Sequence, residues 1–86
     1  LTPKLLDIVE SLPNKTGIYY IHNEIGNLIY IGKSKNIKKR VNQHFTDSNQ
    51  KNKNIQKEVY TVTFEETGSE LIANLKEIEI RGKLSN

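Results

Sequence analysis

Alternating apolar and polar positions early in the chain predict a β-hairpin. One segment begins at Gly17 and a second ends at Lys33, and both are rich in aromatic and β-branched residues. They flank a polar turn at Asn23 to Gly26. Two such segments around a short glycine-containing turn are typical of antiparallel strands joined by a tight loop. We therefore expect this hairpin to be the centre of the fold.

The register of the hairpin follows from the loop length. If residues 23–26 form the loop and Gly26 takes a positive φ, Tyr19 lies opposite Tyr30 on one face. Gly17 and Gly32 share that face, and because they lack side chains a ligand or another backbone could approach closely there. Spacing alone leaves two interpretations open: a cleft beside the tyrosines, or an aromatic pair that only stabilises the hairpin.

Helical periodicity predicts a helix on each side of the hairpin. Thr2 is a suitable N-cap for a first helix that has Pro3 in its first turn. Asn36 is a good N-cap for a second helix that runs to about Phe45. Its buried stripe falls at i, i+4 and i+8, at Ile37, Val41 and Phe45.

The second half of the chain predicts a loop, a strand and a helix. Residues 46–54 are polar and rich in Asn, Lys and Ser, which is typical of a loop, and 58–64 alternate as a third strand. Residues 67–70 have the form of a capping box and open a helix that runs to about Arg81 and ends at Gly82. The apolar positions of this helix are Leu71, Ile72, Leu75 and Ile78, and Glu70, Ala73, Glu77 and Arg81 form the adjacent row.

Length and composition indicate one small domain of 86 residues. The absence of Met leads us to expect that Leu1 is not a translation start and that the domain comes from a longer chain. The absence of Cys excludes disulfides and thiolate metal sites and is compatible with a reducing compartment. No apolar segment reaches membrane-spanning length.

Charge is distributed unevenly along the chain. The formal net charge is +3, but the segment 33–57 carries basic residues against Asp47 alone: Lys33, Lys35, Lys38, Lys39, Arg40, Lys51, Lys53 and Lys57. The segment 58–79 is mainly acidic. A basic middle suits a polyanion such as nucleic acid, although a solvated lysine-rich surface is the alternative.

The side chains that could carry chemistry lie on these predicted elements, and they are Tyr19, Tyr30, Lys33, Arg40, His44 and Glu77. A single carboxylate is a typical anchor for Mg²⁺ or Mn²⁺, an Arg fork binds phosphate, and a tyrosine with a nearby His can move a proton. Together they describe metal-assisted phosphodiester hydrolysis. Taken singly, each has an ordinary structural role, such as a solvated Glu77 or a packing His44.

Residues 16–19, 29–40 and 67–70 together resemble the GIY-YIG nuclease family. They contain Gly17-Ile18-Tyr19 and Tyr30-Ile31-Gly32, followed by Lys33 and then Arg40. The likeness covers Thr16 to about Arg81. It is greatest to the branch found in the N-terminal domain of the bacterial excision-repair incision nuclease and in domains appended to DNA polymerase III epsilon-like exonucleases.

The resemblance implies an α/β fold of the α+β type, in which helices flank a small three-stranded antiparallel sheet in one domain over residues 1–86. It implies that Tyr19 and Tyr30 are active-site tyrosines, one of them a general base. Arg40 then contacts the scissile phosphate and Lys33 lies at the mouth of the site. His44 occupies a place where some members carry histidine.

The resemblance also implies a metal ligand and DNA contacts. Glu77 matches the metal-binding glutamate, for Mg²⁺ or Mn²⁺, with Glu79 as the alternative. Gly32 permits close approach, and the basic positions expected to contact DNA are Lys35, Lys38 and Lys39. Members of this branch continue to a Pro-containing segment that ends in an active-site Asn, whereas Asn86 comes earlier and lacks that Pro. We therefore expect that the end of the motif is missing from this chain.

The leading hypothesis is a divalent-metal-dependent DNA endonuclease domain of a bacterial repair or replication protein, at work in the cytoplasm at the nucleoid. The alternative is a catalytically silent DNA-binding or interaction module attached to a larger nuclease or polymerase subunit. The expected partners are DNA and other domains of the same protein, without a membrane. The sequence leaves open the DNA structure recognised and the oligomeric state.

Overall fold

Strand β1 (Gly17–His22) is the centre of a three-stranded antiparallel sheet, between β2 (Leu28–Ser34) and β3 (Thr61–Glu66). The computed structural model describes residues 1–84. The described residues also form four helices: α1 (Pro3–Glu10), α2 (Ile37–Thr46), α3 (Gln50–Glu58) and α4 (Glu70–Leu84). The predicted fold class, a small three-stranded sheet flanked by helices, is confirmed.

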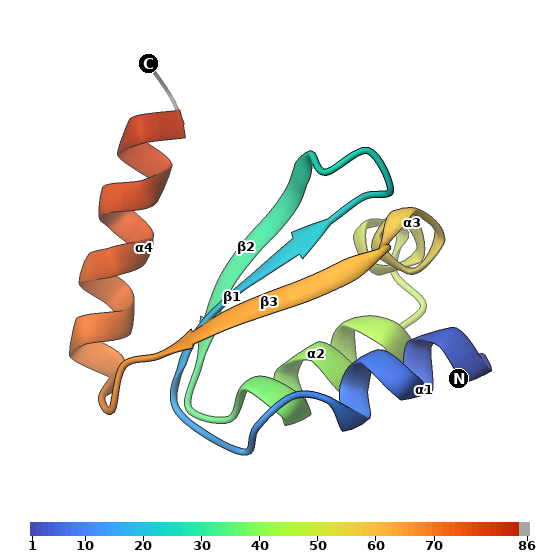
Figure 1. Cartoon of the computed structure of the whole chain (residues 1–86), viewed down its shortest axis with the longest axis horizontal. Coiled ribbons are helices and arrows are strands. Elements are labelled where there is room, and N and C mark those ends of the chain that lie inside the picture. The colour runs from blue at the N-terminus through green and yellow to red at the C-terminus, as the bar shows by residue number, and fades with distance from the viewer. Residues whose placement is uncertain (85–86) are drawn as a thin grey trace.

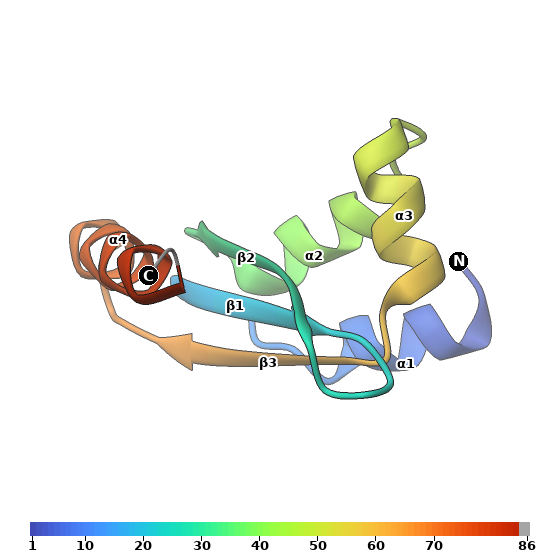
Figure 2. The same ribbon diagram turned by 90° about the horizontal axis from the view of Figure 1, so that it is seen from above.

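The helices are divided between the two faces of the sheet. In both views α4 stands apart from α1, α2 and α3 (Figures 1 and 2). The largest buried cluster joins Tyr19 and Ile21 of β1 to residues of α1, α2 and α3. On the other face, where α4 contacts β1 and β2, Ile18 and Ile31 are buried.

Two helix starts agree with the sequence prediction. The Thr2 hydroxyl accepts a hydrogen bond from the Leu5 backbone N–H at 3.2 Å. The Asn36 side chain accepts one from the Lys39 N–H at 3.0 Å. In both cases the cap satisfies a backbone donor that the first helical turn leaves without a partner. The stripe Ile37, Val41 and Phe45 is buried, as predicted.

The predicted register of the hairpin is wrong by two residues. Tyr19 pairs with Gly32, not with Tyr30, and Ile21 pairs with Tyr30. The loop is longer than expected: the Asn23 N–H donates to the Asn27 carbonyl at 2.9 Å, and the pairing is irregular between Ile21 and His22. Because side chains alternate with a period of two, the tyrosines still share one face, but diagonally. Gly26 has the predicted positive φ, at 92°.

The loop predicted over residues 46–54 is wrong, because α3 begins at Gln50. The Asn49 side chain accepts a hydrogen bond from the Asn52 N–H at 2.8 Å and caps the helix. Only Asn52 and Ile55 within α3 are buried, so the helix has little apolar periodicity. The strand predicted over 58–64 is displaced to Thr61–Glu66 for the same reason, since α3 extends to Glu58.

The last helix begins and ends differently from the prediction. Ser69, not Thr67, caps it: the Ser69 hydroxyl accepts from the Ile72 N–H at 3.2 Å. Gly82 lies inside α4 and does not end it. None of the described helices is long and apolar enough to cross a membrane. Asn86 lies outside the described residues.

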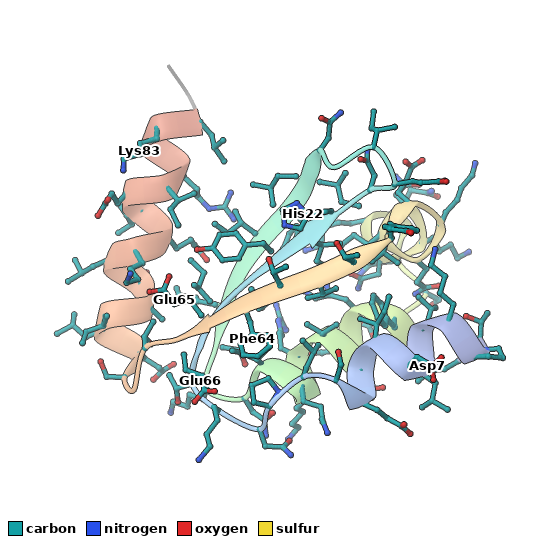
Figure 3. The ribbon with its side chains drawn as sticks, in the orientation of Figure 1. Asp7, His22, Phe64, Glu65, Glu66 and Lys83 are labelled. Atoms are coloured by element: carbon teal, nitrogen blue, oxygen red, sulfur yellow. The ribbon has the colours of Figure 1, made fainter. Side chains whose placement is uncertain are left out.

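The face of α4 that contacts the sheet is not its most apolar one. Ala73 is buried, whereas the predicted apolar positions are 46–69% exposed: Leu71, Ile72, Leu75 and Ile78. A small side chain at Ala73 lets the helix axis approach the sheet closely. Glu65 of β3 lies beside α4, where it forms an ion pair with Lys76 (Figure 3).

Candidate active site

A polar pocket of about 200 Å³ lies along the free edge of β2. Its lining residues come from β1, β2, α2 and α4, and they are Tyr19, Tyr30, Gly32, Lys33, Arg40, Glu77 and Arg81. Five of the six side chains predicted to carry chemistry are in this list. The sixth, His44, is in direct contact with Tyr19.

The position of the pocket follows from the order of the strands. Tyr19 and Gly32 point to the face covered by α2 and α3, and Lys33 points to the face covered by α4. Groups on opposite faces of a sheet are normally kept apart by the backbone between them. Because β2 is an edge strand, Arg40 of α2 and Glu77 of α4 can both reach around it.

Tyr19 is held rigidly at the back of the pocket. It is 1% exposed, and its ring centroid is 6.2 Å from that of Tyr30. Its phenol lies over Gly32, where a Cβ would collide with the hydroxyl oxygen. Burial, with a further contribution from Tyr30, raises the pKa of the Tyr19 phenol well above its usual range, and Arg40 opposes this. The phenol is therefore neutral at physiological pH.

His44 lies behind Tyr19, away from solvent. Its Nε2 is 2.7 Å from the Tyr19 hydroxyl oxygen, and its Nδ1 is 2.7 Å from Oδ1 of Asn52. The ring packs edge-on against Tyr30 with centroids 4.9 Å apart. Burial lowers the pKa of His44, although the hydrogen bond that Nδ1 of His44 makes to Oδ1 of Asn52 opposes the shift. The imidazole is therefore neutral at physiological pH.

Among the residues that the structure describes, Glu77 is the one acidic side chain that lines the pocket. Its side chain is 16% exposed, and Oε1 is 3.4 Å from Nε of Arg81. Arg81 also donates from Nη2 to the Ile31 carbonyl at 2.8 Å, which fixes the guanidinium against β2. Glu79, the alternative metal ligand, does not line this pocket. It is exposed and paired with Lys83 at 3.2 Å.

Arg40 connects the pocket to a second hollow along α2. This hollow is lined by Ser34, Lys35, Asn36, Lys39, Arg40 and Gln43. Nη1 of Arg40 donates to Oε1 of Gln43 at 2.8 Å, so the guanidinium is oriented within this surface. Of the basic residues expected to contact DNA, Lys35 and Lys39 are therefore next to the pocket. Lys38 instead lies at the junction with α1, where its N–H donates to the Pro13 carbonyl at 3.1 Å.

The two glycines beside the tyrosines do not leave an open surface for a ligand. A Cβ at Gly17 would collide with the carbonyl oxygen of Glu65 in β3. The space over Gly32 is filled by the phenol of Tyr19. Gly17 therefore serves the packing of the sheet, and Gly32 positions Tyr19 while its backbone borders the pocket.

Three residues near the site were not predicted from the sequence: Lys51, Asn52 and Arg81. Lys51 and Asn52 belong to α3, where the sequence predicts a loop over residues 46–54. Nζ of Lys51 lies 5.1 Å from the centroid of the Tyr30 ring. The N-cap Asn49 was the available signal for that helix. Arg81 could have been found from its i, i+4 spacing to Glu77.

The donor set suits a hard divalent cation held by few protein ligands. No cluster of three or more His, Cys, Asp or Glu side chains occurs within residues 1–84. One partly buried carboxylate in a polar, open pocket matches the way Mg²⁺ is bound, since that ion keeps several waters and takes further oxygen ligands from substrate phosphate. Glu77 would hold such an ion.

The fold and the site can be compared with known proteins. The crystal structure of the GIY-YIG N-terminal endonuclease domain of UvrC from Thermotoga maritima, bound to magnesium as its catalytic divalent cation, superposes with a TM-score of 0.83. The two sequences are 24% identical, and the alignment covers 96% of this chain and 92% of that one. This likeness establishes the fold.

Sequence relatives point the same way. The UvrABC system protein C of Dictyoglomus thermophilum is 38% identical over 69 residues, which is 80% of this chain and 12% of that protein. The protein of the same name from Methanococcus maripaludis is 35% identical over 79 residues, 90% of this chain and 15% of its own length. The chain thus spans a small part of these relatives. The family model described as the UvrC-like GIY-YIG domain matches residues 15–83, and the chain belongs to this family.

Proposed function

We propose that this domain is a divalent-metal-dependent endonuclease that hydrolyses DNA phosphodiester bonds in repair or replication. The observation that carries the proposal is the pocket at the edge of β2. There, two tyrosines, Arg40, Lys33 and the partly buried carboxylate of Glu77 border one space. Membership of the UvrC-like GIY-YIG family supports the same reaction.

The charges around the pocket fit a phosphodiester. Arg40 offers a planar fork of donors for the scissile phosphate, and Lys33 is a compact positive charge at the mouth. Lys35, which precedes α2, and Lys39 within it extend this surface, and they would contact the neighbouring backbone of DNA. A cation on Glu77, Mg²⁺ or Mn²⁺, supplies a Lewis acid that stabilises negative charge on the phosphate.

The tyrosines and His44 form the route for the proton of the attacking water. Either phenol could accept this proton, and the two differ in the side chain that each contacts on the side away from the pocket. Tyr19 touches Nε2 of His44, so it can pass its own proton inward as it takes one from water. Tyr30 is half-buried and has the Lys51 ammonium over its ring. We assign the relay to Tyr19 and His44, with Tyr30 as the positioning phenol.

A nicking assay tests the proposal. Supercoiled plasmid and bubble DNA are incubated with the protein and Mg²⁺ or Mn²⁺, beside a metal-free sample with chelator. We expect metal-dependent nicking that Glu77→Gln reduces by at least about 100-fold, because loss of the ligand removes several kcal/mol of charge stabilisation. Glu79→Gln is the matched control, since Glu79 is on the same helix but outside the pocket. Undiminished nicking by Glu77→Gln would contradict the proposal.

A second function is supported by the ion pair between Glu77 and Arg81. In this arrangement the guanidinium of Arg81, from the same chain, pairs with the carboxylate of Glu77 that a metal would need. The alternative is therefore a catalytically silent module that binds DNA through the basic face of α2 for an attached enzyme. Tight binding with a steep dependence on salt, and no nicking with either metal, is the result that distinguishes it.

The setting of the domain is also part of the proposal. The greater length of the relatives supports a domain that works beside others, as in an excision-repair nuclease. A place beside a DNA polymerase III epsilon-like exonuclease is the alternative, and it rests on the family resemblance of the sequence alone. We place it in the bacterial cytoplasm at the nucleoid, where its substrate is found. Pull-down of the full-length protein with nucleoid DNA, compared between low and high salt, tests this placement.

A further inference from the structure

We infer that Asn52 is a positioning residue that fixes the tautomer of His44 and thereby the direction of the Tyr19 hydroxyl. Asn52 lies on α3, outside the pocket, and is 3% exposed. Its importance for the reaction rests on the proposed function. The tautomer itself is a property of the free protein and can be measured without DNA.

The orientation of the Asn52 amide is determined by Asp47. A carboxylate only accepts hydrogen bonds, so the atom of Asn52 that faces Asp47 must be the NH₂ group. Nδ2 of Asn52 indeed lies 3.4 Å from Oδ2 of Asp47. The other end of the amide, Oδ1, therefore faces His44, and it can only accept.

The tautomer of His44 follows from this orientation. Since Oδ1 of Asn52 is an acceptor 2.7 Å from Nδ1, Nδ1 must carry the ring proton. A neutral imidazole has one N–H, so Nε2 is left with a lone pair. Nε2 is 2.7 Å from the Tyr19 oxygen, and the Tyr19 hydroxyl must donate to it.

The consequence lies at the pocket wall. The Tyr19 O–H bond points inward to His44, so the lone pairs of the phenol oxygen are the part left to face the pocket. Tyr19 then meets a water or hydroxyl in the pocket as a hydrogen-bond acceptor. In the opposite tautomer, Nε2–H would donate to Tyr19, and the phenol proton would turn toward the pocket and compete with substrate.

Hydrogen bonds from both ends of helix α3 hold Asn52 in a fixed position. The Asn49 side chain caps the helix at the Asn52 N–H itself, at 2.8 Å. Nε2 of Gln56 donates to the carbonyls of His44 and Asp47, at 3.0 and 2.9 Å, and so ties α3 to the end of α2. These bonds hold Asn52, Asp47 and His44 in one rigid unit.

The experiment reads the ring nitrogens of the free protein by ¹⁵N NMR. The chain has two histidines, so His22, whose Nε2 is near the Thr63 hydroxyl, is the internal reference. We expect the His44 proton on Nδ1 in the wild type. In Asn52→Leu, which is similar in size and has no acceptor, we expect the proton to move largely to Nε2. A proton on Nε2 in the wild type would overturn the inference.

An exchange of side chains provides the rescue. In Asp47→Asn with Asn52→Asp the net charge is unchanged, the new carboxylate accepts from Nδ1–H, and the new amide donates to that carboxylate. We expect the proton to remain on Nδ1 in this double variant. If Asn52→Leu does not fold by circular dichroism, the wild type and the double variant decide the question. A double variant that folds with the proton on Nε2 would contradict the positioning role.

Activity is measured separately. Asn52→Leu should lower the nicking rate about 10- to 100-fold while DNA binding is unchanged, and the double variant should recover part of it. The two proposals fail independently. A wild-type protein that does not nick DNA contradicts the proposed function and leaves the tautomer result standing. An unchanged nicking rate in a folded Asn52→Leu contradicts the positioning role alone.

Discussion

The two sides of the sheet are built by different means. On one side α1, α2 and α3 bury a continuous cluster that includes Tyr19, Ile37 and Val41, and the polar groups among them are paired. On the other side α4 contacts the sheet around one buried residue of its own, Ala73, and leaves Leu71, Leu75 and Ile78 more than half exposed. The first side holds the fold together, whereas the second carries Glu77 to the pocket.

The pocket depends on both sides but in different ways. Tyr19, His44 and Asn52 are fixed by packing and short hydrogen bonds, so their geometry is settled before a substrate arrives. Glu77 is instead placed by a helix with few buried contacts and an ion pair to Arg81. The difference indicates that the wall formed by Tyr19 and His44 is rigid and the wall formed by Glu77 is adaptable.

The largest difference in stability should appear at Ile37, on the densely packed side. Ile37 is fully buried among α1, α2 and β1, so Ile37→Ala removes buried apolar surface and leaves a cavity. We expect it to lower the free energy of unfolding by about 2–5 kcal/mol. Urea denaturation followed by circular dichroism measures this loss. A change below about 1 kcal/mol would mean that this face is not the main core.

A matched pair of glycines gives the next effect. In Gly32→Ala the new methyl group meets the Tyr19 phenol, and we expect a loss of about 1–3 kcal/mol from overpacking. In Gly82→Ala no described atom outside the helix's own backbone lies within 4 Å of the new Cβ, and α4 should gain up to about 1 kcal/mol in helix propensity. Thermal unfolding of the two variants compares them directly. A stabilising Gly32→Ala would show that Tyr19 does not occupy the place described.

The dependence of stability on pH should report the buried histidine. Burial, helped by Arg40 and Lys51 and opposed by Asn52 and Asp47, holds the pKa of His44 below its usual value. Just below the unfolded pKa of about 6.5, the unfolded chain binds more protons than the folded one. The contribution of His44 to the free energy of unfolding should therefore be complete above this pH. It should decrease as the pH falls toward the lowered pKa of the folded state.

Removal of the buried imidazole tests this pH effect. His44→Gln should flatten the dependence of unfolding free energy on pH in that window. Urea titrations at several pH values measure the slopes of the wild type and of the variant. A His44→Gln variant with an unchanged slope would contradict the assignment.

The same contrast explains what the sequence could predict. The stripe at Ile37, Val41 and Phe45 is read easily, because a helix that packs on a core repeats its apolar residues at helical spacing. The caps at Thr2 and Asn36 are equally local signals. The convergence of the site residues was also predictable, but only through the family motif that joins segments far apart in the chain.

The features that were missed depend on tertiary contacts. Helix α3 is held to α2 by Asn52 and Gln56 through hydrogen bonds, and such polar contacts leave no apolar period in the sequence. The register error arose at an irregular turn whose length Gly26 alone does not fix. On α4 the periodicity was read correctly, but the apolar row faces solvent because Ala73 makes the close contact with the sheet.

The smallest effect is expected at Leu75. It is also the sharpest test of the finding that α4 contacts the sheet through Ala73 and not through its apolar row. This side chain is 57% exposed, so Leu75→Gln removes few contacts and should change the free energy of unfolding by less than about 0.5 kcal/mol. Ala73→Leu is the control on the opposite face, where a larger side chain has no room and should cost about 1–3 kcal/mol. Denaturation of both variants in urea gives the comparison. If Leu75→Gln were the more damaging of the two, α4 would pack on the sheet through the apolar row that the sequence favours, and Glu77 would be turned away from the pocket.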